Sequence, residues 1–430
     1  MLTCPSYERC GACQGLKQPY AEQLAWKRDA VSQAFRAEGL RIRVQDVCGM
    51  EEPYHYRNKV IAAVSMQGSR VVCGLYEAYS HRVVPVADCL LHDKRLNAVL
   101  ATLESLLNKL KIKPFGYGGV LKHLLLRVGG KTGQVMVVLV TSEELMHGRK
   151  ELLARLRTAH PEVATVVQNI QPRQTSVVLG EREKVLFGPG YIFDELLGLR
   201  YKISARSFYQ INPSQTERLY AKALSLAELR PGERLMDAYC GIGTIGLSAA
   251  AASAVQTGPI CTSQAEKMAP PVQNGPICTS VASKTAAAVQ TGPICTSQAE
   301  KAADIQVLGV EINRDAVRDA IANARANNIS NARFHCADVS AFMRESGESV
   351  DVLILDPPRA GCDEDFLRSV LRLAPARIIY VSCNPGTQAR DLAYLTGGRR
   401  PAYQLASDAW PFDLFPHTDH VENVIALSRV

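Results

Sequence analysis

The stretch Ser382–Gly386 places a thiol, that of Cys383, on a sharp turn after an apolar run. Ile378–Val381 is β-branched and aromatic and has no helical period, so it predicts a strand. Proline and glycine then end the strand, and a new helix is predicted to begin at Thr387. Open α/β sheets bind ligands beyond the carboxyl ends of their strands. Cys383 is therefore a candidate nucleophile, although most free cysteines are small buried apolar residues.

Other predicted strands of the same half of the chain also end in polar residues. The predicted strands are 234–239, 307–311, 332–336, 350–355, 378–381, 403–407 and 422–427. The polar residues at their ends are Asp237, Tyr239, Glu311, Asp338 and Asp356. Because the carboxyl ends of parallel strands share one edge of a sheet, the pattern predicts a single ligand crevice there.

A glycine pattern, Gly241-x-Gly243-x-x-Gly246, follows the strand 234–239. Glycines at this spacing let the backbone approach a ligand and begin the next helix. The pattern fits a nicotinamide or flavin dinucleotide, S-adenosyl-L-methionine, or a tight turn without a ligand. Glu311 then occupies the place of the acid that binds a ribose hydroxyl, about 20 residues after the glycines, once a repeat insertion is set aside.

That insertion spans about 253–305 and contains three related units, which start at Val255, Val272 and Val289. The units are polar and too short to bury a core of their own, so they predict a disordered surface loop. A longer loop costs little free energy, which explains why a tandem duplication is tolerated between a helix and a strand. The three cysteines at equal spacing within it are copies of one another rather than a predicted metal site.

Three cysteines near the N-terminus, Cys4, Cys10 and Cys13, together with the distant Cys89, form a candidate set of four thiolate ligands. Four thiolates bind either an iron–sulfur cluster or structural zinc. Their spacing is not the paired C-x2-C arrangement of a zinc ribbon, so we favour a [4Fe–4S] cluster over zinc.

The composition is that of a globular protein of 430 residues, 47% hydrophobic and 21% charged, with a net charge of +7. No apolar run is long enough to span a membrane, and the N-terminus has no signal-peptide pattern. The 13 cysteines are odd in number, so without an export signal they predict a reducing cytoplasm rather than disulfides.

Two domains are expected, 1–203 and 204–430. The first is basic and predicts an α+β fold with helices at 23–35 and 144–160 and strands at 60–64, 70–76, 124–128, 135–140 and 165–167. Basic residues alternate there with tyrosines, which suits phosphate contacts and base stacking on RNA as well as an ordinary solvated surface. The second domain predicts helices at 217–227 and 314–327 and an α/β fold.

Taken in order, several motifs resemble those of the bacterial RNA uracil-C5 methyltransferases. The motifs are C-x5-C-x2-C with a distant cysteine, F-Y-Q-I-N-P, D-A-Y-C-G-I-G-T-I-G, L-D-P-P-R-A-G, V-S-C-N-P-G-T and H-T-D-H-V-E. The cysteine set is similar to that of the [4Fe–4S] branch that acts on 23S ribosomal RNA, rather than to the branch that acts on transfer RNA. Some ribosomal-RNA members carry a further N-terminal β-barrel domain, whereas this sequence starts at the cysteines.

The resemblance implies a Rossmann-like S-adenosyl-L-methionine-dependent methyltransferase domain preceded by a smaller α+β iron–sulfur RNA-binding domain. It implies that Cys383 is the nucleophile and Glu422 the base. The residues implied to line the cofactor site are Gln210, Tyr239, Thr244, Glu311, Asp338 and Asp356. It further implies a monomer with 23S ribosomal RNA as its partner, no membrane association and no protein partner.

Three alternatives remain at this point. The first is methylation of transfer RNA by the same chemistry. The second is a dinucleotide-dependent iron–sulfur oxidoreductase, which the glycine and cysteine patterns allow but which gives D-P-P-R and S-C-N-P no role. The third is an RNA-binding protein that keeps the fold without catalysis.

Overall fold

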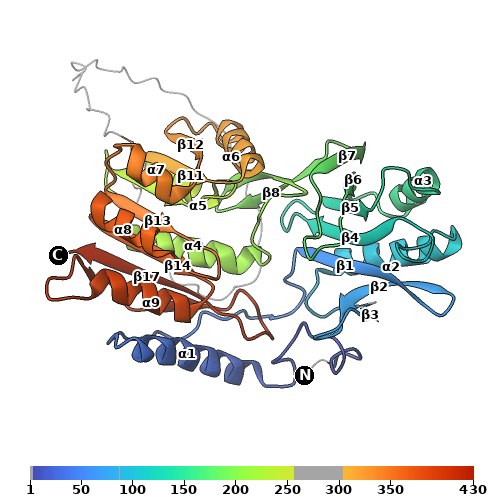
Figure 1. The fold of residues 1–430 in the computed structure, drawn as a ribbon, viewed down its shortest axis with the longest axis horizontal. Helices are drawn as coiled ribbons and strands as arrows, with labels where there is room; N and C mark the ends of the chain where they lie inside the picture. The colour runs from blue at the N-terminus through green and yellow to red at the C-terminus, as the bar shows by residue number, and fades with distance from the viewer. Residues whose placement is uncertain (1–2, 87, 256–303) are drawn as a thin grey trace, which may run out of the picture.

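The computed structural model describes residues 3–86, 88–255 and 304–430. Two sheets, each with its own helices, lie side by side and are joined by a hairpin (Figure 1). The predicted surface loop lies, apart from its ends, outside the described residues, as do the three cysteines of the repeats. None of the described helices combines the length and apolarity needed to cross a bilayer.

The C-terminal sheet has eight strands, ordered β12-β11-β10-β13-β14-β17-β15, with β16 paired to β17. Its parallel strands are β10 (Arg234–Ala238), β11 (Gln306–Glu311), β12 (Ala332–Cys336), β13 (Val352–Leu355) and β14 (Arg377–Ser382). Its antiparallel strands are β15 (Tyr403–Leu405), β16 (Trp410–Phe412) and β17 (Glu422–Arg429). Because β17 runs against β14, Glu422 at the start of its strand lies at the same edge as the carboxyl ends of the parallel strands.

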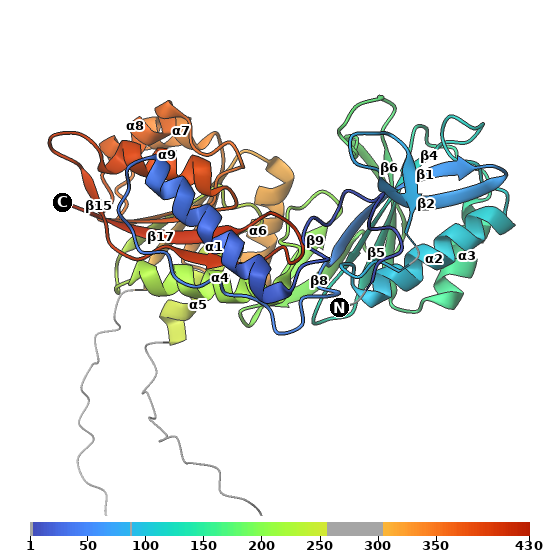
Figure 2. The ribbon, with the colours of Figure 1, turned by 90° about the horizontal axis from the view of Figure 1, so that it is seen from below.

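Helices cover both faces of this sheet. The first face packs against α4 (Pro213–Ala227), α5 (Thr244–Val255) and α6 (Arg314–Ala326). The second face packs against α7 (Val339–Glu345), α8 (Glu364–Leu373) and α9 (Pro385–Thr396). From the N-terminal part of the chain, α1 (Tyr20–Ala37) lies alongside α9 and buries Val31 and Phe35 in the same core (Figure 2).

The N-terminal sheet has seven strands in the order β3-β2-β1-β4-β5-β6-β7. These are β1 (Lys59–Gln67), β2 (Arg70–Tyr76), β3 (Val83–Pro85), β4 (Leu121–Val128), β5 (Val135–Thr141), β6 (Val163–Ile170) and β7 (Arg182–Phe187). Helices α2 (Lys94–Lys109) and α3 (Arg149–Ala159) cover one face. The other face packs with the hairpin β8 (Tyr191–Leu196) and β9 (Leu199–Ser204) into the core that continues into the C-terminal sheet. The two sheets therefore share one apolar core.

Four predicted helix starts differ from the structure. Helix α1 begins at Tyr20 rather than at residue 23, and the other three differences each have a local cause. Helices α4 and α9 begin at Pro213 and Pro385, earlier than predicted, since each proline occupies the first helical turn and the preceding asparagine caps the helix. Proline has no amide hydrogen to lose at that position, so Asn-Pro starts these helices rather than ending the previous segment. Helix α3 begins later than predicted because Gly148 before it has a left-handed φ of 75°.

Candidate active site

A cavity of about 500 Å³ opens at the carboxyl edge of the C-terminal sheet. Its walls contain seven of the residues singled out above, namely Gln210, Tyr239, Thr244, Glu311, Asp356, Cys383 and Glu422. Asp338 is not among the lining residues; its side chain caps α7 and accepts a hydrogen bond from Ala341 N at 2.9 Å. Its carboxylate is nevertheless close enough to the lining residue Tyr239 to help raise the pKa of that phenol. The structure thus brings together residues that lie up to about two hundred positions apart.

The neighbouring strands β14 and β17 place Cys383 and Glu422 together. Ser382 pairs with Asn423 in the antiparallel ladder. Cys383, which follows Ser382, and Glu422, which precedes Asn423, therefore both lie on the cavity side of that pair. Gln388 of α9 fixes this junction, since its amide group donates to Tyr380 O at 2.9 Å and accepts from Asn423 Nδ2 at 2.7 Å. The thiol and the carboxyl group therefore share a rigid corner of the cavity.

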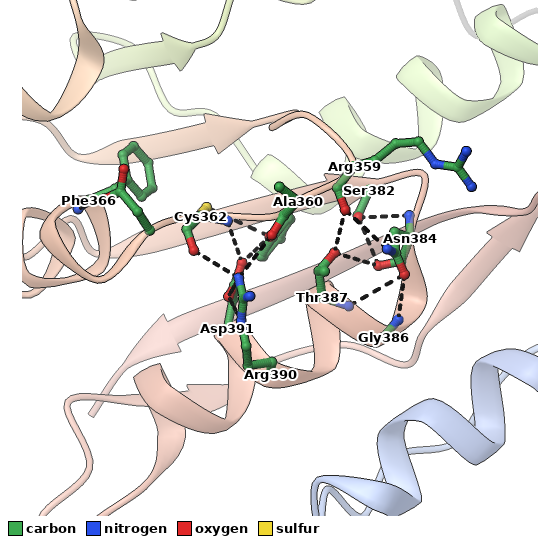
Figure 3. Close-up of polar contacts among 12 residues, drawn as sticks. Arg359, Ala360, Cys362, Phe366, Ser382, Asn384, Gly386, Thr387, Arg390 and Asp391 are labelled. Carbon is green, nitrogen blue, oxygen red and sulfur yellow. Dashed lines mark hydrogen bonds and ion pairs between the residues drawn. The ribbon is translucent and has the colours of Figure 1, made fainter.

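The turn after Cys383 is fastened to the loop that follows Asp356 (Figure 3). Asn384 caps α9 by accepting from Gly386 N at 3.0 Å, and its amide nitrogen donates to Arg359 O at 3.0 Å. Thr387 Oγ1 donates to the same carbonyl at 3.3 Å. In Figure 3 the guanidinium group of Arg359 extends away from these contacts. Its Nη2 atom lies 3.2 Å from His420 Nδ1, and Arg359 lines the cavity.

A buried carboxylate holds the far end of that loop. Asp391 of α9 accepts hydrogen bonds from Cys362 N at 2.8 Å and from the Tyr380 hydroxyl at 2.6 Å (Figure 3). Arg390 donates to Asp391 and to Cys362 O. The loop and α9 consequently form one unit, and the thiol and Asp356 keep a fixed relative position.

The acids of the cavity affect one another's ionisation. Burial raises the pKa of Asp356 to about 7, and burial together with Asp356 raises the pKa of Glu422 well above its usual value. Burial, Glu422 and Asp356 raise the pKa of the Cys383 thiol to about 12, while Arg359 acts in the opposite direction. Burial in this cavity thus favours the neutral forms of these groups, with Arg359 as the cation that offsets a negative charge there.

The glycine turn between β10 and α5 forms the opposite wall. Gly241 has a φ of +55° and nothing within 4 Å of the position where a Cβ atom would lie, so its backbone faces open space. Its amide nitrogen lies 3.2 Å from Glu311 Oε2, and Glu311 Oε1 accepts from Asn313 N at 2.8 Å. Tyr239 before it has a left-handed φ of 64°. The turn therefore presents backbone and one carboxylate to a ligand.

Several lining residues received no role from the sequence. They are Phe208, Tyr209, Tyr220, Cys240, Ile242, Ile245, Pro357, Pro358, Arg359 and Phe415, whereas Asp237, which also lines the cavity, was already predicted at the end of its strand. Arg359 stands within the D-P-P-R motif, and that position was the one available signal for it. Phe415 comes from a loop between β16 and β17, and its place in the cavity depends on long-range contacts.

Those contacts come from α1. Lys27 Nζ lies 2.6 Å from Asp413 Oδ1, with both side chains fully buried, and also donates to Phe415 O at 3.1 Å. The Tyr20 hydroxyl donates to Asp413 Oδ2 at 2.8 Å. Buried His417 accepts a backbone bond from Gln14 N at 2.9 Å and stacks on Tyr54. The N-terminal segment thus fixes the loop that leads to Glu422.

Replacing Lys27 with methionine is expected to lower the free energy of unfolding by about 3–5 kcal/mol, because Asp413 would keep a buried charge without its cation. The measurement is urea-induced unfolding. Arg28→Met is the matched control, since its partner Asp46 lies at the surface at 2.8 Å, and loss of an exposed pair costs less than about 1 kcal/mol. Equal losses in the two variants would contradict this role for Lys27.

The four N-terminal cysteine candidates lie near one another. The pKa of the Cys13 thiol is raised by burial and by Cys89, Cys10 and Cys4, and the pKa of Cys89 is raised by burial and by Cys10 and Cys4. Cys13 also packs on the small core that contains Cys89. Within the described ranges, however, no three His, Cys, Asp or Glu side chains lie close enough to hold a single metal ion.

Comparison with known proteins gives a consistent result. Residues 297–430 match the family model "tRNA (Uracil-5-)-methyltransferase", and residues 211–360 match "RMKL-like, methyltransferase domain". An uncharacterized RNA methyltransferase of Halalkalibacterium halodurans is 35% identical over 99% of this chain and 82% of its own length. An uncharacterized RNA methyltransferase of Listeria innocua is 36% identical over 99% of this chain and 83% of its own length.

Among solved structures, the tRNA (uracil-54, C5)-methyltransferase of Pyrococcus abyssi in complex with S-adenosyl-L-homocysteine superimposes with a TM-score of 0.70. It is 24% identical, and the match covers 99% of this chain and 87% of that one. This likeness shows that the two chains share a fold.

Proposed function

This chain belongs to the RNA uracil-C5 methyltransferases, and on that premise we propose that it methylates C5 of a uridine in 23S ribosomal RNA through a covalent bond between Cys383 and C6 of the base. The family and fold establish an S-adenosyl-L-methionine-dependent RNA methyltransferase. One observation carries the proposed chemistry. A single cavity brings together the Cys383 thiol, the buried carboxyl groups of Asp356 and Glu422, and all of the predicted cofactor residues except Asp338.

The first step belongs to Cys383. Uracil C5 is a poor nucleophile, and addition of the thiolate to C6 moves the electron pair of the C5–C6 double bond toward C5 and O4. The thiol proton must leave before that addition, because burial and the neighbouring acids raise the pKa of Cys383 to about 12. Asp356 and Glu422 are the carboxyl groups in place to accept it, and Arg359 offsets the negative charge that forms.

The second step belongs to Glu422. Bound S-adenosyl-L-methionine supplies the methyl group that C5 acquires. Glu422 then removes the proton from C5, the electron pair of that C–H bond restores the C5–C6 double bond, and the Cys383 thiolate leaves C6. Burial and Asp356 raise the pKa of Glu422, which makes its ionised form a stronger base than an exposed carboxylate.

The residues of the opposite wall fit the cofactor. Glu311 is placed to accept hydrogen bonds from ribose hydroxyls, as acids at this position of a Rossmann-like site do. The open space over Gly241 allows a ligand to approach the backbone. Gln210, Tyr239, Thr244 and Asp356 complete that part of the wall. The target uridine must leave its stack to reach a cavity of this kind.

The choice of RNA rests on the cysteine set, which resembles that of the ribosomal-RNA branch. Transfer RNA is the alternative, and the description of the matched family model favours it. The test is to incubate the purified protein and tritiated cofactor separately with unmodified transcripts of 23S ribosomal RNA and of transfer RNA. We expect label in the ribosomal transcript, at one or a few uridines. Label confined to transfer RNA would overturn this choice.

A [4Fe–4S] cluster on Cys4, Cys10, Cys13 and Cys89 is the second part of the proposal. Each thiolate of a cubane cluster binds a different iron, so its ligands stand farther apart than the ligands of one zinc ion. The mutual effects of these thiols on pKa support their closeness to one another.

Protein purified without air is expected to be brown, to absorb near ~400 nm and to contain roughly four irons per chain. Cys13→Ser is expected to lose both colour and iron. Cys48→Ser is the control, because that half-buried thiol lies near Gln215 and outside the set. A colourless preparation with one zinc per chain would refute the cluster.

A further inference from the structure

A second cavity, of about 350 Å³, lies between the N-terminal loop and the β1–β2 edge of the N-terminal sheet. Arg57, Lys59, Tyr76 and His92 provide its polar and aromatic lining. The remaining walls are mostly apolar and small side chains, with the thiol of Cys89 among them, and no carboxylate of the described residues lines it. A concave site with cations and an aromatic ring suits an anionic, partly apolar ligand.

No carboxylate of the described residues pairs with either cation. Within the part of the chain that the structure describes, neither the ammonium group of Lys59 nor the guanidinium group of Arg57 has a hydrogen-bond or ion-pair partner. Burial, Arg127 and Arg57 lower the pKa of Lys59 to about 8. His92 adds a buried Nδ1 atom without a partner. Both side chains are half-buried, and two unpaired cations that line one cavity without a carboxylate suit a ligand that brings negative charge.

This second cavity is adjacent to the catalytic one. Residues 57–60 alternate between half-buried and buried side chains, so Arg57 and Lys59 face one side and Asn58 the other. Asn58 Nδ2 donates to Gln210 O at 2.9 Å, and Asn58 N donates to Ile211 O at 2.9 Å. Gln210 lines the catalytic cavity, so one short segment separates the two sites.

We propose that the second cavity binds one nucleotide of the substrate RNA close to the target uridine, with its phosphate on Arg57 and Lys59 and its base against the ring of Tyr76. The inference rests on the proposed RNA substrate and adds a subsite to it. Tyr76 is 46% exposed and lies edge-on to His81 and His123. An exposed aromatic ring beside two cations is a typical stacking platform for a single-stranded base.

The test compares Lys59→Gln with the wild type by filter binding of a 23S ribosomal RNA transcript between 50 and 200 mM salt. We expect roughly a tenfold loss of affinity and a plot of log affinity against log salt that is shallower by about 1, the signature of one lost phosphate contact. The melting temperature of the free protein is expected to rise, because the variant removes an unpaired, half-buried charge.

Three further variants serve as controls. Lys59→Arg keeps the charge and is expected to keep the salt dependence. Lys150→Gln removes an exposed cation of α3 on the same domain and is expected to change neither affinity nor melting temperature. Arg57→Gln tests the same site independently if Lys59→Gln does not fold. Iron content and cofactor binding are measured for every variant and are expected to match the wild type.

Unchanged RNA affinity and salt dependence in both Lys59→Gln and Arg57→Gln would overturn the proposal. Loss of iron in these variants would also overturn it, since the cations would then neutralise the thiolates that include Cys89. Failure of both variants to fold would assign the cations a structural role instead. If the wild type methylates no RNA but the binding pattern holds, only the proposed methylation fails. If methylation is normal and the pattern is absent, only the subsite fails.

Discussion

Replacement of Cys383 with alanine is expected to abolish the covalent adduct with 5-fluorouridine-containing RNA and to lower the rate of methyl transfer by roughly 10⁴-fold or more. The size follows from nucleophilic catalysis, because without a thiolate at C6 the C5 carbon has no electron pair to offer. Fluorine at C5 cannot leave as a proton, so in the wild type the adduct survives on a denaturing gel and measures the first step directly.

The control is Cys336→Ala, which removes an exposed thiol at the end of β12. We expect its adduct yield and turnover to equal those of the wild type. Binding of S-adenosyl-L-methionine by Cys383→Ala, followed by calorimetry, is expected to remain close to normal and thus to separate chemistry from folding. An adduct of unchanged yield in Cys383→Ala would show that another group is the nucleophile.

The surroundings of Cys383 explain why its thiol needs neighbouring groups to become ionised. A thiol whose pKa is raised to about 12 is almost fully protonated at neutral pH, so the fold alone does not activate it. The charge of Arg359 acts to lower that pKa, and the carbonyl group of the same residue anchors the turn of Asn384. The loop after Asp356 thus supplies both the position and the counter-charge.

Local patterns predicted the catalytic edge well because they depend on neighbouring residues. Strand runs that end in polar residues placed Glu311, Asp356 and Cys383 at one edge, and the structure brings them into one cavity. The direction of β17 was not visible in its composition, since antiparallel and parallel strands use similar residues. Glu422 nevertheless reaches the site because an antiparallel strand that starts at this edge presents its first residue there.

Features that depend on contacts between residues far apart in the chain could not be predicted from the sequence. Asp338 follows a strand as the others do, and its carboxylate also caps α7, a contact that the pattern did not predict. Lys27 looks like an ordinary helical lysine, but the fold buries it against Asp413. The unpaired state of Lys59 likewise emerges only when β1, β2 and the N-terminal loop are assembled.

Glu422→Gln is expected to separate the two halves of the reaction. Glutamine keeps the size of the side chain but cannot accept the C5 proton, so turnover is expected to fall by about 10²–10⁴-fold. Formation of the Cys383 adduct is expected to persist, because Glu422 raises the pKa of that thiol and its neutral replacement favours the thiolate. Natural uridine RNA should therefore accumulate as a methylated protein adduct.

The measurement is the transfer of a tritiated methyl group into a protein–RNA adduct on a denaturing gel. After RNase digestion, the labelled species is expected to migrate close to the size of the protein alone. The double variant Cys383→Ala/Glu422→Gln is expected to form none of it, and Glu345→Gln, an exposed carboxylate at the end of α7, is expected to turn over normally. Full turnover by Glu422→Gln would transfer the role of base to another group, of which Asp356 is the nearest candidate in chemistry and place. Absence of any adduct in that variant would instead mean that Glu422 acts first, by accepting the proton of the thiol. Without that first step no adduct forms, and the later removal of the C5 proton could not be observed.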